Sequence, residues 1–245
     1  MIIDTHAHLQ FDAYDQDRDE VIKKTLAENI QCINVGTSFA TSKAGVELAE
    51  KQGGLYAAIG LHPTDVDEAL NVEDYRDLAK SKKVVAIGEI GLDYFRPPFD
   101  KEKQKEVFLQ QVGLAKELHL PVVIHCRMAH DEMIEILASQ KLYGVIHCFT
   151  GTLEQAQKYV ELGFYLGING IIFKFNIDEV IKEIPLEKLV LETDCPYLTP
   201  PMAPTKRNEP LFMSYTIQKI AELKNITAVE VQKITTENAK KLFNI

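Results

Sequence analysis

The sequence predicts an α/β protein in which eight parallel strands close into a TIM-type (β/α)8 barrel. Apolar, β-branched runs recur eight times, polar stretches with helical spacing separate them, and 245 residues suit one barrel of about 250 residues. The runs lie at residues 2–3, 30–35, 55–61, 84–90, 121–124, 144–146, 164–168 and 189–191.

Each run is apolar throughout, which is typical of parallel strands that are covered on both faces. The stretches between them have a helical pattern: Phe108, Val112 and Ala115 recur at intervals of four and three residues and so share one helix face. Strands that alternate with helices form a parallel sheet, and eight strands favour a closed barrel over an open doubly wound sheet.

The chain changes character after the eighth run. Five prolines lie between Pro196 and Pro210, which predicts a long loop at the active face. Two extra C-terminal helices are expected, one with an apolar stripe that begins at Met213 and one that begins at Thr227 with a capping-box pattern. No repeat or linker divides the chain, so residues 1–245 are expected to form a single hydrolase domain.

Charge and composition limit the partners. The formal net charge is -9 and the sequence pI is about 5.3, which argues against a broad basic surface that coats nucleic acid. No basic N-terminal region and no run of roughly 20 apolar residues occurs, so we expect a cytoplasmic protein without a membrane partner. The four cysteines lack CxxC spacing and are expected to be reduced thiols, mostly buried.

Side chains that can bind metal stand at the ends of the predicted strands. His6 and His8 are two residues apart, so strand alternation turns both imidazoles to one side, although such a pair can also be a polar rim. Titratable residues then end strand after strand, and in a parallel barrel these ends meet at the catalytic face. They are His62, Glu89, His125, His147 and Asp194.

These side chains are too numerous for one catalytic ion, which keeps about three protein ligands, but they suit two ions that share a carboxylate. Glu89 is the best bridging candidate, because it follows the small Gly88 and no lysine ends a predicted strand to form a carbamylated bridge. Asp194 is expected to bind one ion and to accept a proton from bound water, whose pKa a metal ion lowers enough to give hydroxide near neutral pH. The predicted ligands are His6, His8, Glu89, His125, His147 and Asp194.

Six ordered motifs resemble the TatD-related metal-dependent deoxyribonucleases of the amidohydrolase superfamily. They span nearly the whole chain and read DTHAHL, GLHP, IGEIGLDY, VIHCR, HCFTG and LETDCPYL. The resemblance implies an exonuclease that hydrolyses phosphodiester bonds of single-stranded DNA, with RNA as a further candidate substrate. It also implies two divalent ions per chain (Mg²⁺, Mn²⁺ or Zn²⁺), and no obligate protein partner is evident.

The resemblance also implies roles for individual positions. One ion would be held by His6, His8, Glu89 and Asp194, and the other by Glu89, His125 and His147. Phosphate contacts would come from His62 and Arg127, with local positive charge from Lys206 and Arg207 in the proline-rich loop. The stretch just before this pair, residues 201–205, departs from the pattern of many family members, which leaves the shape of the substrate site at the loop open.

Several alternatives remain at this point. A binuclear barrel could instead hydrolyse an amide, lactone or phosphotriester, and a vestigial site would make the chain a non-catalytic metal or nucleic-acid binding protein. Asp4 and Glu192 could orient ligands without touching metal. His130 is a weaker candidate for substrate contact, and strand alternation is expected to turn Cys126 and Cys148 away from the site.

Overall fold

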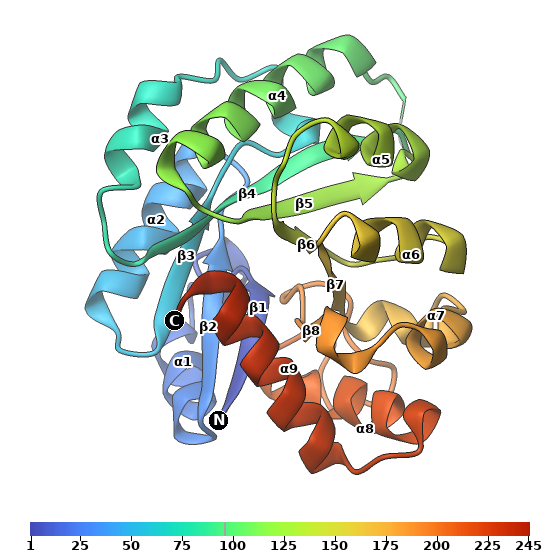
Figure 1. The fold of residues 1–245 in the computed structure, drawn as a ribbon. Helices are drawn as coiled ribbons and strands as arrows, with labels where there is room; N and C mark the ends of the chain where they lie inside the picture. Colours follow the sequence, from blue (N-terminus) through green and yellow to red (C-terminus); the bar gives the residue numbers. More distant parts are fainter. Residues whose placement is uncertain (96) are drawn as a thin grey trace.

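A computed structural model describes residues 1–95 and 97–245, and its eight strands form one parallel sheet in the order in which they occur along the chain. The predicted TIM-type barrel is confirmed, with helices around the ring of strands (Figure 1). The strands are β1 (Ile2–Ala7), β2 (Ile30–Val35), β3 (Leu55–Ile59), β4 (Val84–Asp93), β5 (Val122–Arg127), β6 (Gly144–Ile146), β7 (Tyr165–Ile168) and β8 (Leu189–Leu191).

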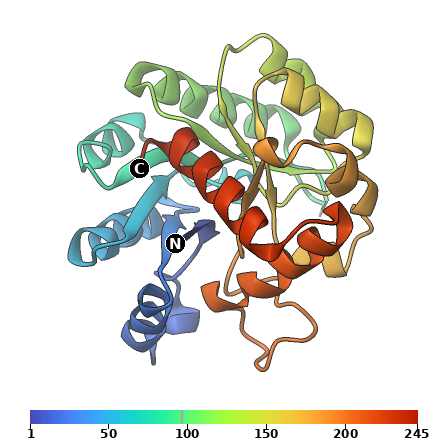
Figure 2. The ribbon, with the colours of Figure 1, turned by 60° about the horizontal axis from the view of Figure 1, so that its bottom comes forward.

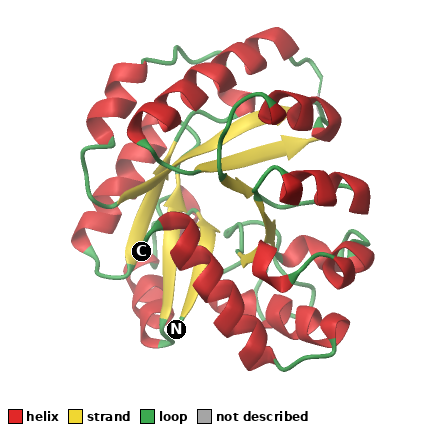
Figure 3. Cartoon of the chain, in the orientation of Figure 1, coloured by secondary structure: helices red, strands yellow, loops and turns green. Residues whose placement is uncertain are grey.

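Helices alternate with the strands around the barrel, and two more follow β8 (Figure 3). The α-helices are α1 (Arg18–Ala27), α2 (Phe39–Lys51), α3 (Val72–Leu78), α4 (Lys101–Leu118), α5 (His130–Ala138), α6 (Leu153–Glu161), α7 (Asp178–Glu183), α8 (Met213–Lys224) and α9 (Ala228–Phe243). Short 3-10 helices are η1 (Asp12–Tyr14), η2 (Pro63–Asp65), η3 (Gly170–Phe173), η4 (Leu186–Lys188) and η5 (Pro210–Phe212). Within the described ranges, no helix combines the length and apolar character that a membrane crossing requires.

Three strands continue past the carboxyl ends of their apolar runs. β1 continues to Ala7, which pairs with Asn34, and β4 and β5 continue to Asp93 and Arg127, which pair with each other. Polar residues therefore occupy the carboxyl ends of these strands, because the backbone ladder extends beyond the hydrophobic segment. His6 consequently lies within β1, which holds it more firmly than a loop would.

The barrel closes between β1 and the segment that follows β8. Ala7 forms a parallel bridge with Cys195, and the Asp194 N–H donates a hydrogen bond of 2.8 Å to the His6 carbonyl. The Thr5 hydroxyl also donates to the Leu191 carbonyl at 3.0 Å. The strand count predicts that the barrel is closed. Backbone and side-chain hydrogen bonds between β1 and the region of β8 make this closure.

Helix α9 covers the amino end of the barrel. Its apolar residues Ala239, Leu242 and Phe243 pack with inward-facing side chains from every strand, among them Ile3 and Val190. The helix lies across the ring of strands in Figures 1 and 2. The Thr227 capping box at its start is confirmed. With the amino end covered, the carboxyl end is left for the polar site.

Asn238 connects α9 to the barrel through two hydrogen bonds. Its buried amide donates to the carbonyls of Leu186 and Leu189 at 2.8 and 2.7 Å. Replacement by alanine leaves both carbonyls without this donor, so Asn238→Ala should lower the free energy of unfolding by about 2 kcal/mol. Urea denaturation would measure this, with exposed Glu237→Ala as a control that changes stability by less than about 0.5 kcal/mol. Equal stability of the two variants would contradict the assignment.

Candidate active site

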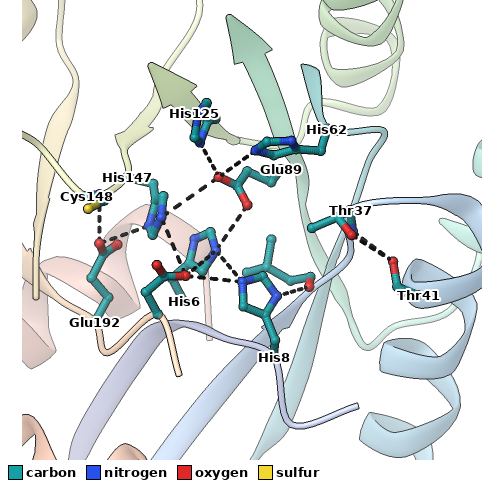
Figure 4. A network of polar contacts seen from close by, with 12 residues as sticks. His6, His8, Thr37, Thr41, His62, Glu89, His125, His147, Cys148 and Glu192 are labelled. Carbon is teal, nitrogen blue, oxygen red and sulfur yellow. Dashed lines mark hydrogen bonds and ion pairs between the residues drawn. The ribbon is translucent and has the colours of Figure 1, made fainter. Parts of the chain in front are cut away.

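The predicted metal ligands lie together at the carboxyl ends of the strands. They come from five places around the ring, with His6 and His8 both at the end of β1, and Glu89 lies among the imidazoles in Figure 4. His6 is in β1, Glu89 in β4 and His125 in β5. His147 follows β6, and Asp194 follows β8. The structure therefore gathers side chains that are up to 188 residues apart in sequence.

Glu89 is surrounded by four histidines and is only 4% exposed. Its Oε1 atom lies 2.8 Å from His125 Nδ1, 3.7 Å from His62 Nε2 and 3.9 Å from His147 Nε2. Its Oε2 atom lies 3.4 Å from His6 Nε2. One carboxylate oxygen thus faces β3 and β5, and the other faces β1, which suits a group shared by two ions.

Asp194 meets a second set of imidazoles. Its Oδ1 atom lies 3.2 Å from His8 Nε2, 3.8 Å from His6 Nε2 and 3.8 Å from His147 Nε2. The residue has a φ of 57°, in the left-handed region that aspartate tolerates better than most residues. The sharp turn after β8 lets the carboxylate face the histidines of β1.

The spacing of these donor atoms fits divalent metal ions. Most approach one another to between 3.2 and 3.9 Å, and two ligand atoms that each lie about 2.1 Å from a tetrahedral ion are about 3.4 Å apart. The nitrogens of His6 and His8 face each other at 3.2 Å, an arrangement that a shared cation stabilises. Among the described residues, three groups of donors could hold an ion: His6, His8 and Glu89; His62, Glu89 and His125; His6, His147 and Glu192.

Electrostatics favour a cation at this position. Burial raises the pKa of Glu89, but His6, His62 and His147 outweigh it and hold that pKa well below its usual value. Burial likewise lowers the pKa of His147, yet the carboxylates of Glu192 and Glu89 raise it to about 10. The buried carboxylates are thus stabilised by positive charge nearby. Metal ions could provide this charge in place of the protons on the imidazoles, which metal binding would displace.

Asp93 is a site residue that the sequence interpretation missed. Its Oδ2 atom lies 2.9 Å from His125 Nε2. The available signal was strand alternation, because residues 89, 91 and 93 of β4 share one side. Gly91 between them has a φ of 150°, and a Cβ there would meet the His125 carbonyl oxygen at 1.9 Å. Glycine thus allows β4 to approach β5 closely enough for Asp93 to reach the histidine.

Glu192 orients the His147 ring. Its Oε1 atom lies 2.9 Å from His147 Nδ1 and accepts hydrogen bonds of 2.8 Å from the Cys148 N–H and from the Asn169 amide. Asp4 acts on the opposite side, where it accepts from Thr193 and from the His6 N–H. These contacts support the orienting roles that were expected for the two carboxylates.

Arg127 and His62 share an open cavity of about 820 Å³ beside the cluster. The Arg127 guanidinium stacks on the Phe95 ring, 3.7 Å from its centroid. Among residues 1–95 and 97–245, no carboxylate forms a salt bridge with Arg127. The guanidinium lines the cavity near Asp93, whose pKa it helps to lower, and it is suited to contact a phosphate there.

The structure does not bring Lys206 and Arg207 to this cluster. They line a separate cavity of about 870 Å³ that is bordered by acidic residues. Arg207 donates to both carboxylate oxygens of Asp17 at 2.7 Å and to Glu209 at 3.0 Å. Its charge is already paired, so a direct contact with substrate stays a prediction that this geometry does not support.

Two weaker expectations were wrong. His130 is buried where α5 begins and lies 3.1 Å from the Tyr159 hydroxyl of α6, so it belongs to the packing between these helices. Cys148 does not turn away from the site. Because β6 ends at Ile146 and Cys148 has a φ of 47°, strand alternation no longer applies, and Cys148 lines a cavity together with His147.

A parallel α/β barrel with histidines and carboxylates gathered at its carboxyl end defines the class of barrel hydrolases that bind metal in this position. Within this class, the chain belongs to the TatD related DNase family, whose sequence model matches residues 3–244. The resemblance inferred from the six motifs is thereby confirmed.

The similarity to individual relatives extends over nearly the whole length of both chains. An uncharacterized metal-dependent hydrolase, YabD of Bacillus subtilis, is 44% identical, and the alignment covers 100% of both chains. The 3'-5' ssDNA/RNA exonuclease TatD of Escherichia fergusonii is 35% identical over 100% of this chain and 99% of the relative. The crystal structure of YJJV, a TatD homolog from Escherichia coli, superimposes with a TM-score of 0.94 at 31% identity, covering 100% of this chain and 98% of that one.

The contact between Glu192 and His147 can be tested through metal affinity. In Glu192→Gln, an amide replaces the carboxylate that orients the ring, so affinity for Zn²⁺ should fall by about 10-fold to 100-fold. A competition titration against a chromogenic chelator would measure the loss. Exposed Glu187→Gln is the matched control and should bind like the unmodified protein. Unchanged affinity of Glu192→Gln would contradict the orienting role.

His130 predicts a pH dependence of stability. Burial lowers its pKa from 6.5 to about 4 in the folded protein, so the unfolded chain binds a proton first as the pH falls. The stabilisation from this residue is therefore complete above pH 6.5 and is lost between pH 6.5 and about 4, a change of about 3 kcal/mol.

The pH effect is measured as a difference between two proteins. Urea denaturation of metal-free protein at several pH values should show a shallower loss of stability for His130→Gln, which keeps a polar partner for Tyr159 but does not titrate. All other histidines are common to both proteins, so the difference isolates His130. Identical slopes between pH 6.5 and 4 would show that burial does not shift this group.

Proposed function

We propose that this protein is a divalent-metal-dependent phosphodiesterase that removes nucleotides from the 3' end of single-stranded DNA, with RNA as a second substrate. One observation carries the proposal: buried Glu89 lies within 4 Å of four imidazoles beside a cavity that is lined by Arg127. A cluster of side chains that can bind metal, next to a guanidinium, suits a phosphate ester. The name of the TatD relative as a 3'-5' ssDNA/RNA exonuclease supports this choice of substrate and direction.

We infer that two ions bind per chain, with Mg²⁺, Mn²⁺ and Zn²⁺ as candidates. Glu89 would contribute to both, because its two oxygens face different sets of histidines. His6, His8 and Asp194 would complete one site, and His125 and His147 the other. Bound ions would supply Lewis-acid stabilisation of the phosphate and a water activated near neutral pH.

The remaining residues bind and orient substrate and move a proton. The Arg127 guanidinium is suited to two parallel hydrogen bonds with non-bridging phosphate oxygens, and it is pre-oriented by the Phe95 ring. His62, at the other side of Glu89, would donate to the same phosphate. Asp194 Oδ1 faces the histidine cluster and would accept the proton of the attacking water.

We also infer that residues 1–245 act as one hydrolase domain. The strands run in a single sheet from β1 to β8, and α9 packs against the residues of both β1 and β8, which supports this. A cytoplasmic location stays a prediction from the sequence.

Glu89 provides the direct test. In Glu89→Ala both proposed sites lose a ligand, so release of nucleotides from end-labelled single-stranded DNA should fall at least 100-fold, which is about 3 kcal/mol. Purified protein would be stripped and reloaded separately with Mg²⁺, Mn²⁺ and Zn²⁺ and assayed on DNA and RNA. Exposed Glu161→Ala should retain full activity.

Two outcomes would overturn the proposal. The reloaded protein could release no nucleotides from either nucleic acid while hydrolysing an ester, lactone or amide from a substrate panel. Alternatively, Glu89→Ala could retain the rate of the unmodified protein, which would place the chemistry elsewhere.

A further inference from the structure

A second, narrower cavity opens onto the same cluster of proposed metal ligands. Its volume is about 170 Å³, against about 820 Å³ for the cavity that contains His62. Both cavities are lined by His125 and Arg127, so they meet at the end of β5. A phosphate held by Arg127 would therefore have a wide space on one side and a small one on the other.

The narrow cavity combines proposed ligands with apolar side chains. His147 and Asp194 line it, and Ile171, Phe175 and Leu198 provide the apolar surface. In Figure 4, Cys148 lies directly beside His147, and it lines this cavity too. The cavity is thus continuous with the site where the phosphate would be cleaved.

The fold constructs the apolar side of the cavity. Ile171 lies in η3 after β7, whereas Leu198 belongs to the loop after β8. Gly170 allows these two segments to approach, because a Cβ there would lie 2.2 Å from the Leu198 carbonyl oxygen. Phe175 follows η3 and is 54% exposed, although it is a large apolar ring beside a polar site. An exposed aromatic ring in this position is available for stacking.

We propose that the narrow cavity binds the terminal nucleobase of the strand, with Phe175 as its stacking partner. This rests on the proposed nuclease function. The volume lies below the roughly 300 Å³ of sites that enclose a whole drug-sized ligand, and so suits one planar group. Stacking on an aromatic ring accepts any base, which matches an enzyme that digests strands without regard to sequence.

The two cavities together suit an enzyme that removes nucleotides from the end of a strand. In this arrangement the narrow cavity receives the terminal base and the wide cavity receives the rest of the strand. Phe175 is then a residue that contributes to recognition of the terminal nucleotide.

A binding experiment tests the base contact directly. Metal-loaded protein would be titrated calorimetrically with deoxyadenosine 5'-monophosphate and with deoxyribose 5-phosphate, which lacks the base. Phe175→Ala should weaken binding of the nucleotide by about 10-fold and leave binding of the sugar phosphate unchanged. Phe175→Tyr keeps the ring and should restore nucleotide affinity. Phe39→Ala removes a half-exposed ring that lines neither cavity, and should bind both ligands like the unmodified protein.

A second measurement separates this proposal from the proposed function. Single-stranded DNA with a normal or an abasic 3'-terminal nucleotide would be digested by the unmodified protein and by Phe175→Ala. The variant should lose about 10-fold in the rate of the first cleavage on the normal strand and nothing on the abasic one. Equal loss on both strands, or no loss on either, would overturn the base pocket while nuclease activity stands. Absence of cleavage by the unmodified protein would instead refute the nuclease function itself.

Discussion

The hydrogen bond from the Asp194 N–H to the His6 carbonyl is the contact on which the site depends most. It joins the first strand to the segment after the last one, so it closes the barrel and places Asp194 next to His6 and His8. Without closure, the two halves of the ligand cluster would lie at opposite edges of an open sheet. The same 2.8 Å contact therefore serves both the fold and the chemistry.

A cluster of this kind is unfavourable until a cation neutralises it. Asp194 and Glu89 are buried carboxylates, and burial alone would keep both protonated, yet their neighbours hold both pKa values below the ordinary range. Histidines are the available source of positive charge in the protein itself. Two divalent ions would replace those protons and let each imidazole act as a neutral ligand.

The sequence predicts the site well wherever a strand presents its residues in alternation. His6 and His8 were assigned from a spacing of two, and Glu89 and His125 from their places at strand ends, and the structure brings all four together. Alternation gave the wrong orientation for Cys148, although His147 and Asp194, which also follow strand ends, join the cluster. Cys148 follows the short β6 in a left-handed conformation that no residue pattern reveals.

Contacts between residues that are distant in sequence were also not predicted. Arg207 follows Lys206 in the loop after β8, and the two residues suggest local positive charge. Its salt-bridge partner Asp17 is 190 residues away in sequence, so no neighbouring residue indicates that Arg207 is paired. His130 is three residues after Arg127, a spacing that suggests a contact with substrate. In the structure it begins helix α5 and lies against Tyr159 of α6 instead. Asp93 shares the alternation of Glu89 and could have been found from β4 alone.

The acidic charge of the chain bears on how it would hold an anionic strand. The net charge of -9 argues against a broad basic surface that gives salt-dependent affinity for nucleic acid, and Arg207 is already paired with Asp17. In the proposed function, attraction to phosphate would then come from Arg127, from His62 and from the bound ions. Binding of substrate and binding of metal are in that case thermodynamically linked: each must strengthen the other by the same factor. A strand would be retained only where the ions are in place, which confines an acidic protein's affinity for nucleic acid to its catalytic centre.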